Sequence, residues 1–128
     1  MATVSATTPV ELVEQVVELG LGVVTQPNFV FERGDAYLRD VPELQHHSLY
    51  RVRSLIDQGI ATAFGTDLPF GNPDPWAAMR AATERRTLSG EWLGEHEAVS
   101  PERALSGFLG SLENPFVQRT VTVGTESD

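Results

Sequence analysis

The first clear pattern along the chain is a helical repeat of valines near the N-terminus. Polar residues, mostly glutamates, occupy the opposite face of the same stretch, as expected for an amphipathic helix. Pro9 suits the first turn of such a helix, and Gly20 suits its end. The pattern therefore predicts a helix whose inner stripe contains Val10, Val13, Val16 and Val17.

Two short runs of apolar, largely β-branched residues predict strands. One runs from Leu21 to Thr25 and closes at Pro27, which cannot donate a hydrogen bond to a neighbouring strand. The other runs from Ile60 to Phe64 and stops at a turn rich in glycine and proline. A last β-like run is expected at Thr120 to Val123.

Three more helices are expected after the first strand. They cover about Glu43 to Gln58, Trp76 to Thr87 and Pro101 to Leu109. Arg85 and Arg86 are expected to be a solvated helix end, where positive charge suits the helix dipole.

The remaining long segment, residues 28–42, is rich in aromatic and charged residues and is expected to be a loop with a turn at Gly34-Asp35.

Helices thus alternate with strands, which is typical of an α/β fold with a parallel sheet covered by helices. Two parallel strands alone make a poor sheet, because their faces and edges need cover. The small number of predicted strands therefore indicates that the chain is part of a larger α/β fold.

Composition narrows the functional classes. The chain has 128 residues and a net charge of −9, which disfavours nucleic-acid backbones and anionic membranes as partners. It contains nine arginines and no lysine, so it cannot form a lysine Schiff base or a carboxylated lysine. It contains no cysteine, which excludes disulfides and thiolate chemistry. Its apolar runs are short and its N-terminus carries no positive charge, so we expect a soluble cytoplasmic protein.

Asp67 is the first acid beyond the second predicted strand. Enzymes with parallel sheets place their chemistry at the carboxyl ends of the strands, which makes Asp67 the main catalytic candidate. The alternative is that Asp67 caps a turn or the following helix. Gln26 and Asn28 end the first strand and could bind substrate, or could form the turn around Pro27.

The other candidates have weaker signals. Arg33 and Tyr37 could contact an anionic or aromatic group, although their positions favour a surface role for each. Phe70 and Trp76 flank Asp67 and could shape an apolar pocket, or Trp76 could belong to the core. The three histidines are His46 and His47, which point about 100° apart on a helix, and His96 in a polar loop; none ends a predicted strand.

Three stretches of sequence together resemble the metal-dependent amidohydrolase superfamily. They are GVVTQPNFVFERGDAYL, AFGTDLPFGNPDPWAAMRAATERRT and the SPERAL segment at 100–105. The closer likeness is to the branch of large amidohydrolases that includes N-substituted formamide deformylases.

The resemblance implies a (β/α)8 barrel with a small β-domain, of which this chain supplies the C-terminal part. The expected fold is a partial TIM barrel, comprising the last two strand–helix units plus C-terminal helices. Residues 1–8 are then a frayed N-terminus, 9–110 the C-terminal part of the barrel, and 111–128 the start of a truncated β-segment.

The resemblance also implies a function, the hydrolysis of non-peptide C–N bonds in a small amide or formamide. Asp67 would bind a divalent metal, with zinc favoured, and handle the proton of the attacking water. The family's paired histidines on the first strand, its bridging lysine or acid on the fourth, and its histidines on the fifth and sixth have no counterpart here. We therefore expect the chain alone to bind no metal and to be inactive.

Two other interpretations stay open. The chain could be a non-catalytic remnant, or a piece that depends on a partner and self-associates through exposed barrel edges. It could also be an independent α/β binding domain, which the ordered match of two separate motifs disfavours.

Overall fold

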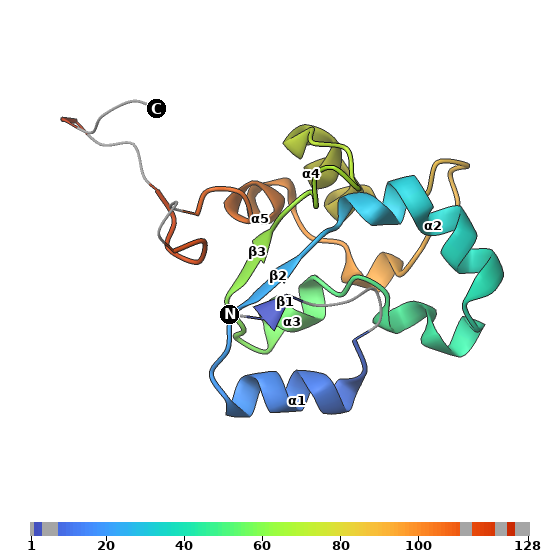
Figure 1. Ribbon diagram of the computed structural model, residues 1–128, viewed down its shortest axis with the longest axis horizontal. Coiled ribbons are helices and arrows are strands. Elements are labelled where there is room, and N and C mark those ends of the chain that lie inside the picture. The colour runs from blue at the N-terminus through green and yellow to red at the C-terminus, as the bar shows by residue number, and fades with distance from the viewer. Residues whose placement is uncertain (1, 4–7, 111–113, 120–122, 125–128) are drawn as a thin grey trace.

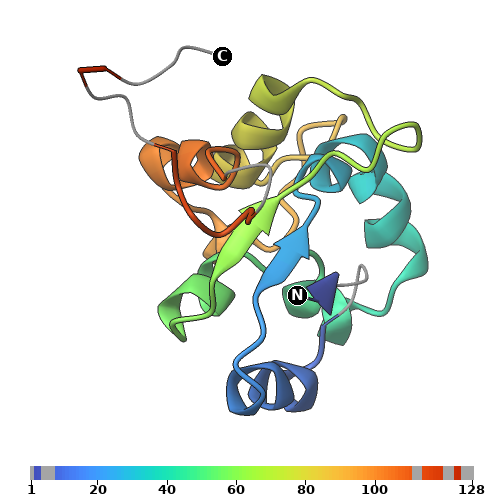
Figure 2. The same cartoon turned by 60° about the vertical axis from the view of Figure 1, so that its left-hand side comes forward.

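A computed structural model describes residues 2–3, 8–110, 114–119 and 123–124 of the chain, shown in Figures 1 and 2. Helices and strands alternate through most of this region. In order, the elements are β1 (Ala2–Thr3), α1 (Val10–Glu18), β2 (Val23–Thr25), α2 (Asn28–Asp40), the 3₁₀-helix η1 (Glu43–Ser48), α3 (Arg53–Asp57), β3 (Thr62–Phe64), α4 (Pro75–Glu84), the 3₁₀-helix η2 (Glu95–Glu97) and α5 (Pro101–Ser106).

The strands form one parallel sheet in the order β1-β2-β3. Ala2 lies opposite Val23, and Val23 lies opposite Thr62. Both predicted strands and the α/β class with a parallel sheet are confirmed. The N-terminal segment, which was expected to be frayed, contains the paired strand β1. Its two residues, one small and one polar, form no pattern from which a strand could be predicted. The arrows in Figure 2 show β2 and β3 running in the same direction.

The core is formed where helices pack on the sheet. Val13 and Val16 of the predicted valine stripe are buried, whereas Val10 and Val17 are about half exposed, at 49% and 45%. One cluster joins α1 to β2 and α3, and its members are Val13, Val16, Val23, Leu55 and Ile60. Another cluster joins β3 to α4 and α5 through Phe64, Met79 and Ala104.

The segment 28–42 is mostly helical, so the prediction of a loop is wrong. Helix α2 runs through Gly34, whose position allows a close approach to the Thr87 side chain that any added Cβ would obstruct. Phe29 and Val30 in its first turn are buried. Tertiary packing thus compensates for the low helix propensity of glycine and for the weak amphipathic pattern.

The predicted helix from Glu43 to Gln58 is two short helices, η1 and α3. Between them the backbone is irregular, and Tyr50 adopts a positive φ of 45°. The two later helices are confirmed but end earlier than expected. Their starts are capped, since Asp74 accepts from the Trp76 N–H and Ser100 accepts from the Arg103 N–H.

The tail after α5 turns back on itself. Gly110 and Gln118 form an antiparallel bridge, and the Arg119 N–H donates to the Leu109 carbonyl at 2.7 Å. Most of the strand expected at Thr120 to Val123 lies outside the described residues. Within the described part of the chain, no helix is long and apolar enough to cross a membrane.

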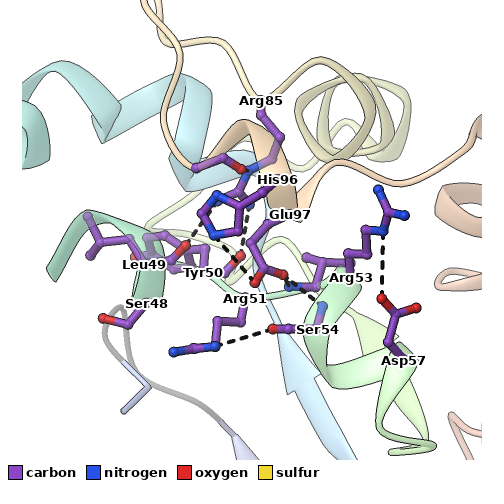
Figure 3. Close-up of polar contacts among 12 residues, drawn as sticks. Ser48, Leu49, Tyr50, Arg51, Arg53, Ser54, Asp57, Arg85, His96 and Glu97 are labelled. Atoms are coloured by element: carbon purple, nitrogen blue, oxygen red, sulfur yellow. Dashed lines mark hydrogen bonds and ion pairs between the residues drawn. The ribbon is translucent and has the colours of Figure 1, made fainter. Parts of the chain in front are cut away.

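Arg85 is fully buried, so its prediction as a solvated helix end is wrong. Its guanidinium donates to four backbone carbonyls, those of Leu49, Tyr50, Leu93 and Gly94, at 2.8–3.1 Å. Figure 3 labels Arg85 with two of these partners, Leu49 and Tyr50. Burial lowers the pKa of Arg85 to about 10, and the charge of Glu97 opposes that shift. The arginine therefore fastens the irregular segment before α3 to the segment after α4.

Glu97 binds the N–H groups at the end of the same irregular segment. One of its carboxylate oxygens accepts from the Val52 and Ser54 N–H groups, each at 2.9 Å, and thereby caps α3. Burial acts to raise the pKa of Glu97, but the hydrogen bonds from Ser54 and Val52 and the charge of Arg85 outweigh it. The net result is a pKa below the ordinary value. The charged form of Glu97 therefore stabilises the fold.

We expect Glu97→Gln to lower the free energy of unfolding at pH 7 by about 1–3 kcal/mol, because a charged acceptor is lost. The folded-state pKa is below the unfolded value. The stabilisation is therefore complete above about pH 4.3 and is lost as the pH falls through the folded-state pKa. Urea titrations across this range should show the difference between the two proteins shrinking in acid. Glu95→Gln, in the same 3₁₀-helix but exposed, is the matched control, and a pH-independent difference for Glu97→Gln would contradict the assignment.

Candidate functional site

The carboxyl ends of β2 and β3 lie side by side at one edge of the sheet. Thr25 pairs with Phe64, and the Gly65 N–H donates to the Thr25 carbonyl just beyond the strands. The segments that follow, Gln26 to Asn28 and residues 65–72, therefore start at the same edge. In Figure 1 this is the side on which β2 leads into α2.

Asp67 lies in the loop that follows β3, and its side chain is exposed. Its φ of 59° is in the left-handed region, which aspartate tolerates better than most residues with a Cβ. Its carbonyl accepts from the N–H groups of Phe70 and Gly71, at 2.8 and 3.0 Å. Asp67 is thus the first residue of a tight turn, and it is exposed to solvent.

Asn28 is 2% exposed and joins this loop to α2. Its side-chain nitrogen donates to the Thr66 carbonyl at 3.1 Å and to a Glu32 carboxylate oxygen at 2.6 Å. Its side-chain oxygen is buried and has no hydrogen-bond partner in the described structure. Gln26 is half-buried beside it, before the first turn of α2.

Arg33 reaches the same loop from the next turn of α2. Its guanidinium donates to the Phe70 carbonyl at 3.1 Å and lies 4.5 Å from the centre of the Phe29 ring. The arginine is otherwise exposed, so its remaining donors face solvent. The site predicted from the sequence, comprising Asp67, Gln26, Asn28 and Arg33, is therefore gathered at one edge, while the roles of these residues stay predictions.

A tyrosine pair lies beneath this cluster, and the sequence alone did not single out Tyr50. The hydroxyls of Tyr37 and Tyr50 are 2.9 Å apart, and the Tyr50 ring packs against Phe29. Burial is the main cause of a raised pKa at Tyr50, followed by its hydrogen bond to Tyr37. The charge of Arg33 lowers that pKa and the charge of Asp67 raises it, so both charges act on this hydroxyl.

Two other aromatic candidates lie apart from the buried core. Phe70 and Trp76 are each 69% exposed, so the interpretation of Trp76 as a core residue is wrong. Trp76 instead lines a groove of about 440 Å³ between α4 and α5, together with Met79 and Leu105 among others. Neither Asp67 nor Phe70 lines this groove.

The histidines do not join Asp67. His46 bonds through Nε2 to the Val41 carbonyl at 2.7 Å, His47 is exposed, and His96 lies 3.9 Å from Glu97. Among the residues that the structure describes, no three His, Asp or Glu side chains are grouped so as to hold a metal ion. The residues around Asp67 therefore do not by themselves fit a metal centre.

Comparison with known proteins places this arrangement in a family. A family model described as amidohydrolase family matches residues 2–107. The N-substituted formamide deformylase of Arthrobacter pascens is 32% identical over 93 residues, which is 72% of this chain and 17% of that protein.

Two solved structures are also similar, both uncharacterized metal-dependent hydrolases. The one from Pyrococcus horikoshii OT3 superposes with a TM-score of 0.71 and 24% identity, over 83% of this chain and 22% of that one. The one from Pyrococcus furiosus has a TM-score of 0.65 and 25% identity, over 81% of this chain and 21% of that one.

The chain thus spans about a fifth of the length of these relatives. The family model nevertheless covers most of the chain itself and includes all three strands, α1 to α5 and Asp67. The resemblance inferred from the sequence motifs is confirmed, and the chain belongs to the amidohydrolase family.

Proposed function

We propose that this chain forms part of the barrel of a hydrolase that cleaves non-peptide C–N bonds of the amide or formamide type. The observation that carries the proposal is the position of Asp67, exposed in the loop after β3 in a chain of the amidohydrolase family. The parallel strands with intervening helices, and the likeness to hydrolases of several times its length, support a partial (β/α)8 barrel. The name of the Arthrobacter relative supports a formamide-type substrate.

Amide hydrolysis requires that water lose a proton and that the departing nitrogen gain one. A single exposed carboxylate can perform both transfers in turn, and Asp67 is the proposed group. Arg33 has donors free to face a polar substrate, and Gln26 lies at the same strand end. Asn28 is the third proposed substrate-binding residue at this edge, but its unpaired side-chain oxygen is buried. A substrate N–H would reach that oxygen only if the loop after β3 moved away from α2.

The described residues do not form a metal centre around Asp67. A zinc or other divalent ion of such an enzyme would therefore need ligands from outside them. The chain alone is accordingly proposed to be inactive, and its cytoplasmic location stays a prediction.

Activity should appear only when the segment is placed in a complete barrel. We expect a chimera, in which residues 9–107 replace the matching segment of the Arthrobacter enzyme, to hydrolyse N-substituted formamides. Asp67→Asn should lower its kcat by about 10²–10⁴, the usual contribution of proton transfer. Asp74→Asn is the matched control, because asparagine can also accept the Trp76 N–H as a helix cap. An Asp67→Asn chimera with full activity would contradict the catalytic role of Asp67. Zinc-dependent turnover by the isolated chain would contradict the proposal that the chain alone is inactive.

The second candidate function is a partner-dependent interaction piece, and the surface of α1 favours it. The middle of its apolar arc is buried, but both flanks are exposed, at Val10 and Val17 on one side and at Leu12 and Leu19 on the other. Such flanks are suited to neighbouring helices.

On this second proposal the purified chain should self-associate as its concentration rises. Sedimentation velocity over a 100-fold range would measure this, and a double variant, Val10→Gln with Val17→Gln, should shift the distribution toward monomer. The control carries glutamines in place of Glu11 and Glu18 on the polar face of the same helix. A monomer at every concentration would exclude self-association through this surface.

A further inference from the structure

Three side chains of α2 bind the loop that carries Asp67, although they lie far from it in sequence. Asn28 donates to the Thr66 carbonyl, Glu32 accepts from the Asn72 N–H, and Arg33 donates to the Phe70 carbonyl. We propose that these residues are a positioning device, here called the α2 clamp. The clamp holds residues 65–72 so that Asp67 keeps its left-handed backbone conformation.

Asn28 is the central member of the clamp. Its buried side-chain nitrogen has two partners, the Thr66 carbonyl and the Glu32 carboxylate, and both can only accept. The orientation of the amide is therefore determined, since a flipped amide would place an oxygen against two acceptors. Thr66 directly precedes Asp67, so this bond fixes the start of the turn.

Glu32 connects the two ends of the loop. One carboxylate oxygen accepts from Asn28 at 2.6 Å, and the other accepts from the Asn72 N–H at 2.9 Å. Asn28 and Glu32 are four residues apart on α2, so they lie on the same face of the helix. The start and the end of the loop are thereby tied to one helical turn.

The loop is closed tightly enough to exclude a side chain at Gly71. A Cβ at this position would collide with the Thr66 carbonyl and with the side-chain nitrogen of Asn28. Gly71 also donates to the Asp67 carbonyl at 3.0 Å. The backbone of Gly71 therefore lies close to both the loop backbone and the Asn28 side chain of the clamp.

The clamp explains how Asp67 keeps an unfavourable backbone conformation. A residue with a Cβ remains at a positive φ only when the surrounding contacts over-determine it. Arg33 adds the third contact, and its stacking on Phe29 limits the positions of its guanidinium. That this geometry serves proton transfer rests on the proposed function, whereas the mechanical role of the clamp does not.

Hydrogen exchange measured by NMR on the full chain tests the clamp without any assay of activity. In Glu32→Ala we expect the Phe70, Gly71 and Asn72 amides to exchange at least tenfold faster. The Cα and Cβ chemical shifts of Asp67 should also move toward random-coil values. The Val23 amide, which donates to Ala61 in the sheet, should be unchanged.

Two further variants complete the design. Glu14→Ala removes an exposed glutamate from α1 and should leave every one of these signals unchanged. Asn28→Asp places a carboxylate against Glu32 and the Thr66 carbonyl, and should release the loop at least as strongly as Glu32→Ala. Should Asn28→Asp fail to fold, Glu32→Ala alone still decides, because Glu32 is exposed.

The proposal of the clamp is contradicted if the hydrogen-exchange rates of the loop amides in Glu32→Ala stay within twofold of those in the unmodified chain. It is equally wrong if all amides accelerate together, since Glu32 would then support general stability alone. The formamide chimera separates this result from the proposed function. An Asp67→Asn chimera with full activity would reject the catalytic role and leave the exchange result intact.

Discussion

The parallel pairing of β2 with β3 is the interaction on which the rest of the structure depends. Val24 lies opposite Ala63, Thr25 lies opposite Phe64, and the pairing continues into the loop through the Gly65 N–H. Both strands therefore end at one edge, and segments distant in sequence begin there together. Without this register, α2 could not reach the loop that carries Asp67.

Around this edge the irregular connections are held by side chains that bond to backbone atoms. Asn28 and Glu32 do so for the loop after β3, while Arg85 and Glu97 do so for the segment between η1 and α3. Burying a charge is costly unless it is satisfied. Arg85 meets that requirement with four carbonyls and Glu97 with two N–H groups, so these connections are anchored at defined points.

Periodicity and turn residues were enough to locate α1, β2, β3, α4 and α5, because each has a local apolar pattern with a clear stop. They failed for α2, where Gly34 looked like a turn but is the point at which the helix closely approaches the Thr87 side chain. They also failed for residues 43–58, where apolar spacing suggested one helix. The interruption there depends on Arg85 and Glu97, whose contacts lie more than thirty residues away in the chain.

The sequence by itself determined the α/β alternation, the membership of the amidohydrolase family and the placement of a carboxylate just beyond a buried strand. These properties depend on the order of neighbouring residues, which is visible without a structure. Only the tertiary structure decided that Arg85 is buried, that Glu97 caps α3 and that Glu32 ties the Asp67 loop to α2. The reason is physical, because a polar side chain can be buried only beside the backbone groups that satisfy it, and folding brings those groups from distant parts of the chain.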